Sequence, residues 1–364
     1  MIRSILFRGS IKGKGIVNYD SNSQSRILWD RFENERDYLR NKNVKIAKHT
    51  FYKQGEKEGK VVWERRLCIS SDCLRQAIFS EDFPFQNTMI MHHPDLLLKV
   101  IASIPALLRG YFFAEEGKVA LKKKSSLMIT GAEQISNGVT HFEINTMSGR
   151  KRQKEDADEA SDTSMHYEEK IGEVEYAFEG AIDLKELQFI SMSETYDRLA
   201  VNPDYSENYR KILSAALGSE VDVKRYYCIK NSVIRTPEEG VVLTQGQVVR
   251  LIQELVKRML LIRIQRSKGY AQIISLEAKI VSDPISDVMS DEGGWKPISR
   301  PDALKIEPGD IEIFYEQVDD KEAEAIFEKV KTNQNEQDTK RKEAKAARKR
   351  GKNKDVTENA DSEV

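Results

Sequence analysis

The chain has 364 residues, of which 39% are hydrophobic and 32% are charged, and its formal net charge is −1. This length accommodates two domains, or one large domain with insertions. The near-zero net charge excludes a protein that is basic over its whole surface, so any surface that binds a polyanion must be local.

Cysteine usage and hydropathy limit the compartment. Cys68, Cys73 and Cys228 form no C-x-x-C pair, which argues against a disulfide framework or a cysteine zinc site and fits a reducing compartment. The N-terminal apolar run is too short for a signal peptide, and no window approaches the ~20 apolar residues of a membrane span. We therefore expect a cytoplasmic protein that does not contact a membrane.

The first predicted element is a basic hairpin over residues 2–17. Ile2, Ile5 and Phe7 mark one strand, and Ile16 starts the next. The glycines between them match neither the dinucleotide-binding fingerprint, whose third glycine is replaced by Asn18, nor a phosphate-binding P-loop. The lysines and arginine of this hairpin suit either a polyanion contact or protection of a sheet edge from aggregation.

A polar insertion and a serine-rich helix follow. Residues 20–59 have few apolar anchors and are expected to be partly helical around 25–39. Residues 61–69 predict a strand, and Ser70 and Ser71 open a helix with Arg75 one turn in. Such a helix start binds phosphate readily, but ordinary serine capping explains the same residues. The neighbouring His92 and His93 lack the spacing of a helical metal pair.

Residues 95–126 carry the strongest pattern. Apolar residues recur at spacings of three and four from Leu96 to Leu108, which predicts an amphipathic helix capped by Asp95 and by Gly110 and kinked or restarted at Pro105. A strand, a turn and a second short run follow. Together they present Arg109 and residues 122–126, which are cations beside hydroxyl groups, as phosphate oxygens favour. A solvated lysine run is the alternative.

The remaining segments alternate between order and charge. Residues 126–149 hold several short apolar pieces, and residues 150–170, with cations first and acids after, predict a mobile loop. Strands are expected at the end of 174–192, at 221–230 and at 311–315, and helices at 205–217, 244–262 and 321–330. Residues 340–354 hold nine Lys/Arg and one Glu, which predicts a disordered tail with nonspecific polyanion affinity.

A short motif follows the 244–262 helix. Lys268, Gly269, Tyr270 and Ala271 match the first four positions of the RRM sheet motif. The later aromatic positions hold Gln272 and Ser275, so the base-stacking platform is incomplete. The match favours basic residues and a close-approach glycine at a strand start over sequence-specific stacking.

Five segments in this order resemble a known family: residues 13–19 (GKGIVNY), 67–79 (LCISSDCLRQAIF), 100–111 (VIASIPALLRGY), 187–198 (LQFISMSETYDR) and 266–270 (RSKGY). Together they resemble the crRNA-binding backbone subunit of type I CRISPR Cascade complexes, a Cas7-family member of the RAMP superfamily. The likeness is closest to the type I-F variant systems and spans roughly residues 2 to 280.

The resemblance implies an α+β fold, with a ferredoxin-like, RRM-type palm and inserted finger- and thumb-like elements. It implies one domain over residues 1–317, with insertions at 20–59 and 150–170, and a charged tail over 318–364. The thumb would fall within 126–170. Copies would stack head-to-tail along the guide RNA and support its pairing with target DNA, beside other Cascade subunits. No chemistry, cofactor or metal is expected.

The resemblance also implies which residues contact the RNA backbone without regard to sequence. The candidates are hydroxyl, amide, aromatic and cationic side chains: Arg8, Lys12, Lys14, Asn18, Ser70, Ser71, Arg75, Arg109, Lys122, Lys123, Lys124, Ser125, Ser126, Arg263, Arg266, Lys268 and Tyr270.

Three alternatives remain open. The first is a type IV effector backbone, which shares the architecture. The acidic half of residues 150–170 and the lysine-rich tail depart from the type I family pattern. A RAMP ribonuclease would use Asp20, Asp30 or Asp37, or a histidine among His92, His93 and His141, although spacing supports neither scheme. A free-standing RNA-binding module would never oligomerise.

Overall fold

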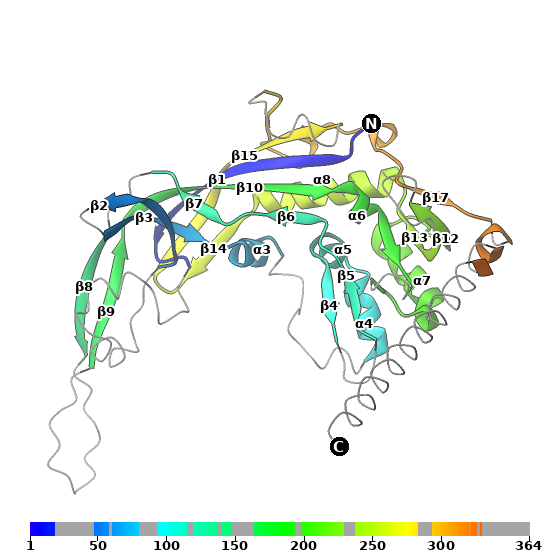
Figure 1. Ribbon diagram of the computed structural model, residues 1–364, viewed down its shortest axis with the longest axis horizontal. Helices are drawn as coiled ribbons and strands as arrows, with labels where there is room; N and C mark the ends of the chain where they lie inside the picture. The colour runs from blue at the N-terminus through cyan, green and yellow to red at the C-terminus, as the bar shows by residue number, and fades with distance from the viewer. Residues whose placement is uncertain are drawn as a thin grey trace, which may run out of the picture.

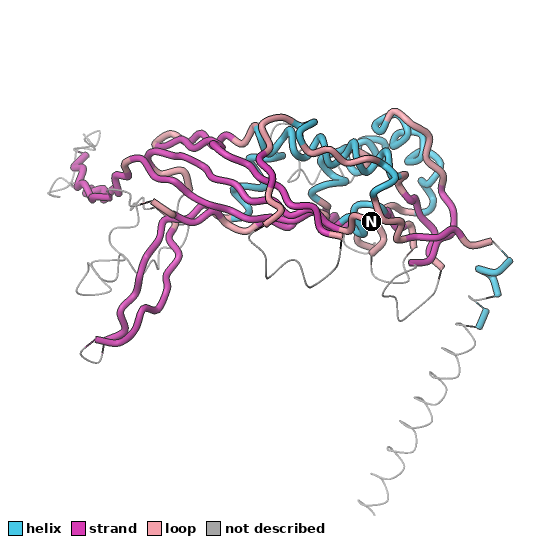
Figure 2. Tube along the Cα trace, turned by 90° about the horizontal axis from the view of Figure 1, so that it is seen from above, coloured by secondary structure: helices cyan, strands magenta, loops and turns pink. Residues whose placement is uncertain are grey.

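A long antiparallel sheet with helices on one face dominates the computed structural model (Figure 1), and its strands are seen from above in Figure 2. The structure describes residues 1–18, 47–57, 60–79, 93–114, 119–136, 140–147, 164–193, 198–228, 237–282, 293–319, 321–325 and 328–329. Two elements extend from the sheet: a β-hairpin at one end and a helix-and-ribbon unit near the middle.

The main sheet runs in the order β14-β15-β1-β10-β7-β3-β2, with β6 paired to β10 and β16 paired to β15. Every pairing within it is antiparallel. Its strands are β1 (Ser4–Gly15), β2 (His49–Lys57), β3 (Lys60–Ile69), β6 (Leu127–Ile129), β7 (Ala132–Gln134), β10 (Glu173–Asp183), β14 (Arg263–Arg266), β15 (Gly269–Val281) and β16 (Lys296–Pro297). The predicted strand at 61–69 is confirmed as β3.

The predicted N-terminal hairpin is wrong, because residues 4–15 form one continuous strand. β1 pairs along its length with β10 on one side and β15 on the other. A Cβ atom at Gly9 would lie 2.6 Å from the ring of Phe178, so this glycine serves close packing rather than a turn. The positive φ expected of a turn glycine occurs only where the strand ends, at Gly15 (φ 75°).

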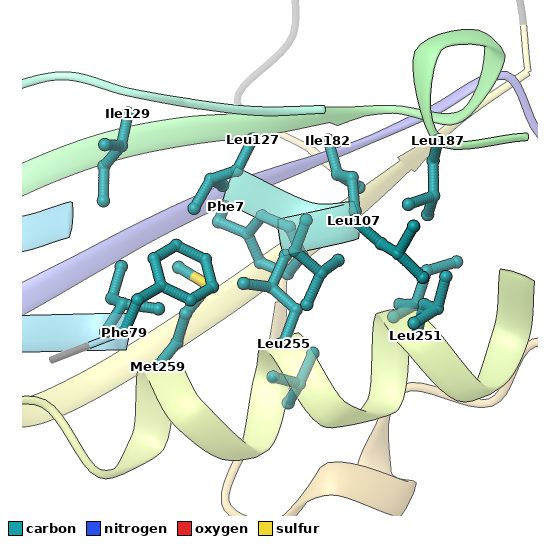
Figure 3. Close-up of a cluster of buried hydrophobic side chains, with 14 of the residues drawn as sticks. Phe7, Phe79, Leu107, Leu127, Ile129, Ile182, Leu187, Leu251, Leu255 and Met259 are labelled. Carbon is teal, nitrogen blue, oxygen red and sulfur yellow. The ribbon is translucent and has the colours of Figure 1, made fainter. Parts of the chain in front are cut away.

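The core lies on one face of β1. Alternate residues of the strand, including Phe7 and Ile11, are fully buried. Helices α3 (Ser71–Phe79) and α8 (Gln245–Leu260) pack on this face (Figure 3), where Phe79 and Met259 lie beside Phe7. Each such side chain contributes about 1.5–3 kcal/mol through burial. Both predictions are confirmed, that of α3 from its serine-rich start and that of α8 from its apolar periodicity.

The central unit consists of α4 (Pro94–Ile101), α5 (Ile104–Arg109), β4 (Tyr111–Phe113) and β5 (Leu121–Lys123). The helix restarts at Pro105, as one of the two expectations had it, because Ser103 caps α5 by accepting a hydrogen bond from the Ala106 amide at 3.4 Å. Asp95 is not the N-cap: α4 begins at Pro94 after His93.

A hairpin of β8 (Thr140–Met147) and β9 (Ser164–Ile171) extends from the sheet. The predicted mobile loop at 150–170 is therefore wrong for residues 164–170, which are paired in β9. The opposite end of the molecule holds a smaller sheet in the order β11-β13-β12-β17, whose strands are Phe189–Ser191, Glu238–Val242, Val223–Cys228 and Tyr315–Gln317.

Short helices connect these parts: α6 (Leu184–Gln188), α7 (Ser206–Leu217), η2 (Pro203–Tyr205), η3 (Pro301–Ala303) and η4 (Pro308–Asp310). The helix predicted at 205–217 is confirmed. The strand expected at 311–315 is displaced, since Ile311 makes one isolated bridge with Ile2 and β17 begins at Tyr315.

Several predictions fall outside the described residues: the helix at 25–39, the tip of the thumb and the tail at 340–354. Residues 49–57, placed in the polar insertion, form β2. The division at residue 317 stays a prediction, although the chain is still packed beyond it, with Val318 and Ala323 buried. None of the helices described is long and apolar enough to cross a membrane.

Candidate nucleic-acid interface

The start of α3 collects polar side chains from separate segments. The Ser70 hydroxyl accepts hydrogen bonds from the Cys73 amide and from the Asn18 side-chain amide, each at 3.3 Å. Ser71, the first helical residue, is half-buried beside them. Serine capping therefore explains Ser70, and the same contact brings Asn18 to the helix start.

Two arginines meet beside this helix. Arg75 donates from one guanidinium nitrogen to the Ser125 hydroxyl at 3.1 Å and from the other to the Leu127 carbonyl at 2.8 Å. Arg109 ends α5 close enough that its pKa is lowered, first by burial and then by the charge of Arg75, while Asp72 offsets part of this effect. Two cations held together in this way favour an anion between them.

Arg266 joins this cluster to a neighbouring pocket. Its guanidinium lies 3.8 Å from the Cys73 sulfur on α3. It also lines a pocket of about 790 Å³ together with Lys14, Lys170, Lys268 and Tyr270. Four cations and no carboxylate are among the residues that line it. We call the start of α3 and this pocket the α3 surface.

The α3 surface includes two lysines that sequence reasoning missed. Lys170 was assigned to a mobile loop, but it lies in β9 and lines the pocket. Lys48 was assigned to a polar insertion, but it is exposed beside Asn18, and its backbone amide donates a hydrogen bond to the Asn18 carbonyl at 2.9 Å. Neither lysine has an apolar pattern around it, so only the strand pairing of Lys170 and the backbone contact of Lys48 bring them here.

The opposite face of the main sheet carries both signs of charge. Arg8 and Lys12 point there, because the alternate residues of β1 face the core. Arg8 forms an ion pair with Glu277 and stacks on Trp295 at 4.5 Å, and Lys12 lies 2.9 Å from the Glu173 carboxylate. The hydrogen bond with Glu173 raises the pKa of Lys12.

This pairing separates the predicted contacts into two groups. Arg263 pairs in register with Gln272, which in turn pairs with Lys12, and Tyr270 pairs with Lys14 two positions along β1. Arg263, Lys14 and Tyr270 therefore share this face. Since Arg8 and Lys12 already have carboxylate partners, their part of this face offers a polyanion little net attraction. The α3 surface offers more, because it joins the start of α3 to the pocket at the end of β1, which four cations and no carboxylate line.

The predicted cluster at residues 122–126 is corrected by strand alternation. Lys123 points inward from β5, is buried, and donates to the Glu186 carbonyl at 2.8 Å. Burial lowers its pKa to about 8. Ser126 is fully buried and donates to the Leu107 carbonyl at 3.4 Å. Both side chains stabilise the fold and are removed from the contact set.

The other three members of that cluster remain near the surface. Lys122 is half-buried and Lys124 is exposed, with its ammonium 3.7 Å from the Glu186 carboxylate. Ser125 contacts Arg75, as described above. The lysine run therefore does not act as one unit, and it continues the α3 surface only through Ser125 and its exposed neighbours.

A family model supplies the identification. The model described as Type I-Fv CRISPR-associated protein Cas7fv-like matches residues 1–289. The chain belongs to this Cas7fv-like family. It is a crRNA-binding backbone subunit of a Cascade-type complex. The expected resemblance to type I-F variant systems is thus confirmed, and the type IV alternative is not supported.

Two solved structures show a distant likeness to this Cas7fv-like chain. One is a chain of a CRISPR RNA-guided surveillance complex, with 10% identity, a TM-score of 0.36, and coverage of 78% of this chain and 72% of that one. The other is a chain of such a complex in a pre-nicking state, with 8% identity, a TM-score of 0.37 and 78% coverage of each. No curated sequence matches the chain.

The candidate catalytic residues are mostly outside the described part of the Cas7fv-like chain. Asp20, Asp30, Asp37 and His92 lie there, and His93 is exposed at the start of α4. Within the described residues, no three His, Cys, Asp or Glu side chains are grouped so as to hold a metal ion.

Proposed function

We propose that this subunit binds the sugar-phosphate backbone of the guide RNA across the α3 surface. The observation that carries the proposal is convergence: Asn18, Arg75, Arg109, Ser125 and Arg266 come from separate segments and meet around one helix. Arginine, hydroxyl and amide groups suit phosphate and ribose oxygens.

The same side chains favour binding that ignores base sequence. Phosphate contacts fix register and orientation but carry no sequence information. Tyr270, whose side chain is 52% exposed at the pocket, adds an aromatic face on which any base can stack. A guide whose spacer varies requires this tolerance.

The strand order supports a ferredoxin-like palm. β1 lies between β10 and β15, α3 precedes β6, β7 and β10 in the chain, and α8 precedes β15. Two strand–helix–strand units interleaved in one antiparallel sheet are the split βαβ arrangement. We take the β8–β9 hairpin, which extends away from this palm, as the candidate thumb.

Family membership supports the wider assembly. Copies of the chain stack head-to-tail along one guide, target DNA reaches the protein through pairing with that guide, and other Cascade subunits join the complex. The subunit acts by binding, without catalysis. Purified chain incubated with Mg²⁺ and labelled RNA should leave the RNA intact. Cleavage that Asp20→Ala abolishes would instead establish the ribonuclease alternative.

The salt dependence of binding tests which face meets the RNA. Arg266→Gln with Lys268→Gln removes two cations from the α3 surface, and Arg8→Gln with Lys12→Gln removes two from the mixed-charge face. For single-stranded RNA the first pair should lower the slope of log K against log salt by about 1.4. The second pair should leave it unchanged.

Sedimentation completes the test. Wild-type protein should form larger particles on longer guides, whatever their sequence, and return to small species after ribonuclease treatment. Equal loss of slope in both double variants would refute the assignment of the face. A monomer on every guide length would refute stacking.

A further inference from the structure

The β4–β5 ribbon carries an exposed aromatic ring, that of Phe112, which has no role in the core. Tyr111 and Phe113 flank Phe112 on β4, and both are buried, whereas the Phe112 side chain is 66% exposed. Val119, just before β5, is 57% exposed. Apolar groups presented to solvent beside polar ones mark interaction sites.

The ribbon holds Phe112 outward by fixing its other side. The Tyr111 hydroxyl donates to the Ala200 carbonyl at 2.9 Å, and its ring lies 5.7 Å from that of Phe113. Lys123, opposite Tyr111 in the pairing, is buried on that same side. Phe112 therefore cannot turn into the core without breaking these contacts.

A cation shares the outer side of the ribbon with Phe112. Lys122 is the direct partner of Phe112 across β4 and β5. The exposed Lys124 follows β5, with its ammonium 3.7 Å from the Glu186 carboxylate. The ribbon is joined to the α3 surface at both of its ends. Ser125, just after β5, accepts a hydrogen bond from Arg75, and one residue separates Arg109 from the start of β4. In Figure 1, α7 lies on one side of the ribbon and the β8–β9 hairpin on the other.

We propose that Phe112 stacks on an unpaired nucleobase whose flanking phosphates approach Lys122 and Lys124. The inference rests on the proposed function, because the strand that supplies the base is taken to run on from the α3 surface. A projecting aromatic side chain with neighbouring cations is the usual arrangement by which proteins hold single strands without reading sequence. The shared ligand is an unpaired base, from either an RNA or a DNA strand.

The test compares strands with and without bases. Binding of the full chain is measured to oligoadenylate RNA, to oligoadenylate DNA and to an abasic strand with the same number of phosphates. Phe112→Ala should weaken binding to a base-bearing strand roughly tenfold and leave binding to the abasic strand unchanged. Phe112→Tyr should retain wild-type affinity. Tyr205→Ala, at another exposed aromatic residue, is the matched control.

The two base-bearing strands identify the source, since only the strand that stacks on Phe112 should be sensitive to Phe112→Ala. Equal weakening on base-bearing and abasic strands, or no weakening on either base-bearing strand, would overturn the proposal. If Phe112→Ala changes the sedimentation of RNA-free protein, then Phe112 makes a contact between protein chains, and the proposal is overturned. If wild-type protein binds none of the strands, the proposed function fails as well.

Discussion

Replacing Lys123 by methionine should change the sign of its effect on stability between neutral and alkaline pH. Lys123 is buried beneath β5, and its ammonium donates to the Glu186 carbonyl. Burial lowers its pKa from 10.5 to about 8. A lowered pKa means that the folded state holds this proton less tightly than the unfolded chain does.

The magnitude follows from that difference. Between about pH 8 and 10.5 the unfolded chain binds more protons at Lys123, so the stability of wild-type protein rises with pH across this window. The full rise is about 3 kcal/mol. Lys123→Met removes the buried cation, which gains about 3 kcal/mol below pH 8, but it also loses a hydrogen bond worth about 1 kcal/mol.

The variant should therefore be about 2 kcal/mol more stable than wild type at pH 7 and about 1 kcal/mol less stable above pH 10.5. Urea unfolding of both proteins at one-unit pH steps measures the difference, and groups that titrate in both proteins cancel. Lys124→Met, at the exposed neighbour, is the control and should show no such crossover. A difference that stays constant with pH would refute the reasoning.

Three further predictions concern packing, a buried ion pair and helix capping, and urea unfolding measures each of them. Gly9→Ala should lower the free energy of unfolding by about 1–3 kcal/mol, because the new Cβ meets the ring of Phe178. Gly246→Ala is the control and should be neutral or stabilising, because no atom lies near its new Cβ. Similar effects of the two changes would contradict the packing role of Gly9. Glu238→Ala should cost about 2 kcal/mol by removing the buried partner of Arg198, and no loss would exclude that pair as a stabilising one. Thr244→Ala should cost about 1 kcal/mol through loss of the α8 capping box, and an unchanged midpoint would argue against the cap.

The helices could be predicted from sequence because their signals are local. The periodicity in α8 and in the α4–α5 pair, the proline that separates the latter and the serine that begins α3 all lie within a few residues of the structure they determine. The same holds for the strand β3.

The hairpin prediction for β1 was wrong because its glycines pack against residues that are far away in the sequence. Gly9 accommodates Phe178, and Gly13 accommodates Ala271, each more than 150 positions along the chain. Locally, glycines among lysines have the composition of a turn. Only the pairing with β10 and β15 reveals a central strand.

The candidate site was predicted as a set of residues but not as a surface. The list joined side chains from both faces of the sheet, because nothing in the sequence shows that Glu277 neutralises Arg8. Strand alternation in β5 likewise places Lys123 in the core and leaves Lys122 only half-buried. A strand of three residues is too short to show an alternating hydrophobic pattern in the sequence.

The central position of β1 also constrains how the protein is made. Ser4 pairs with Asp183 on one side and with Val281 on the other. During synthesis the first strand to leave the ribosome must wait for about half of the chain before β10 exists, and for most of the chain before β15 exists. Such long-range pairing slows folding and leaves strand edges exposed meanwhile. Chains truncated before residue 281 should therefore lack a closed sheet and aggregate, so production of this subunit depends on completing β15.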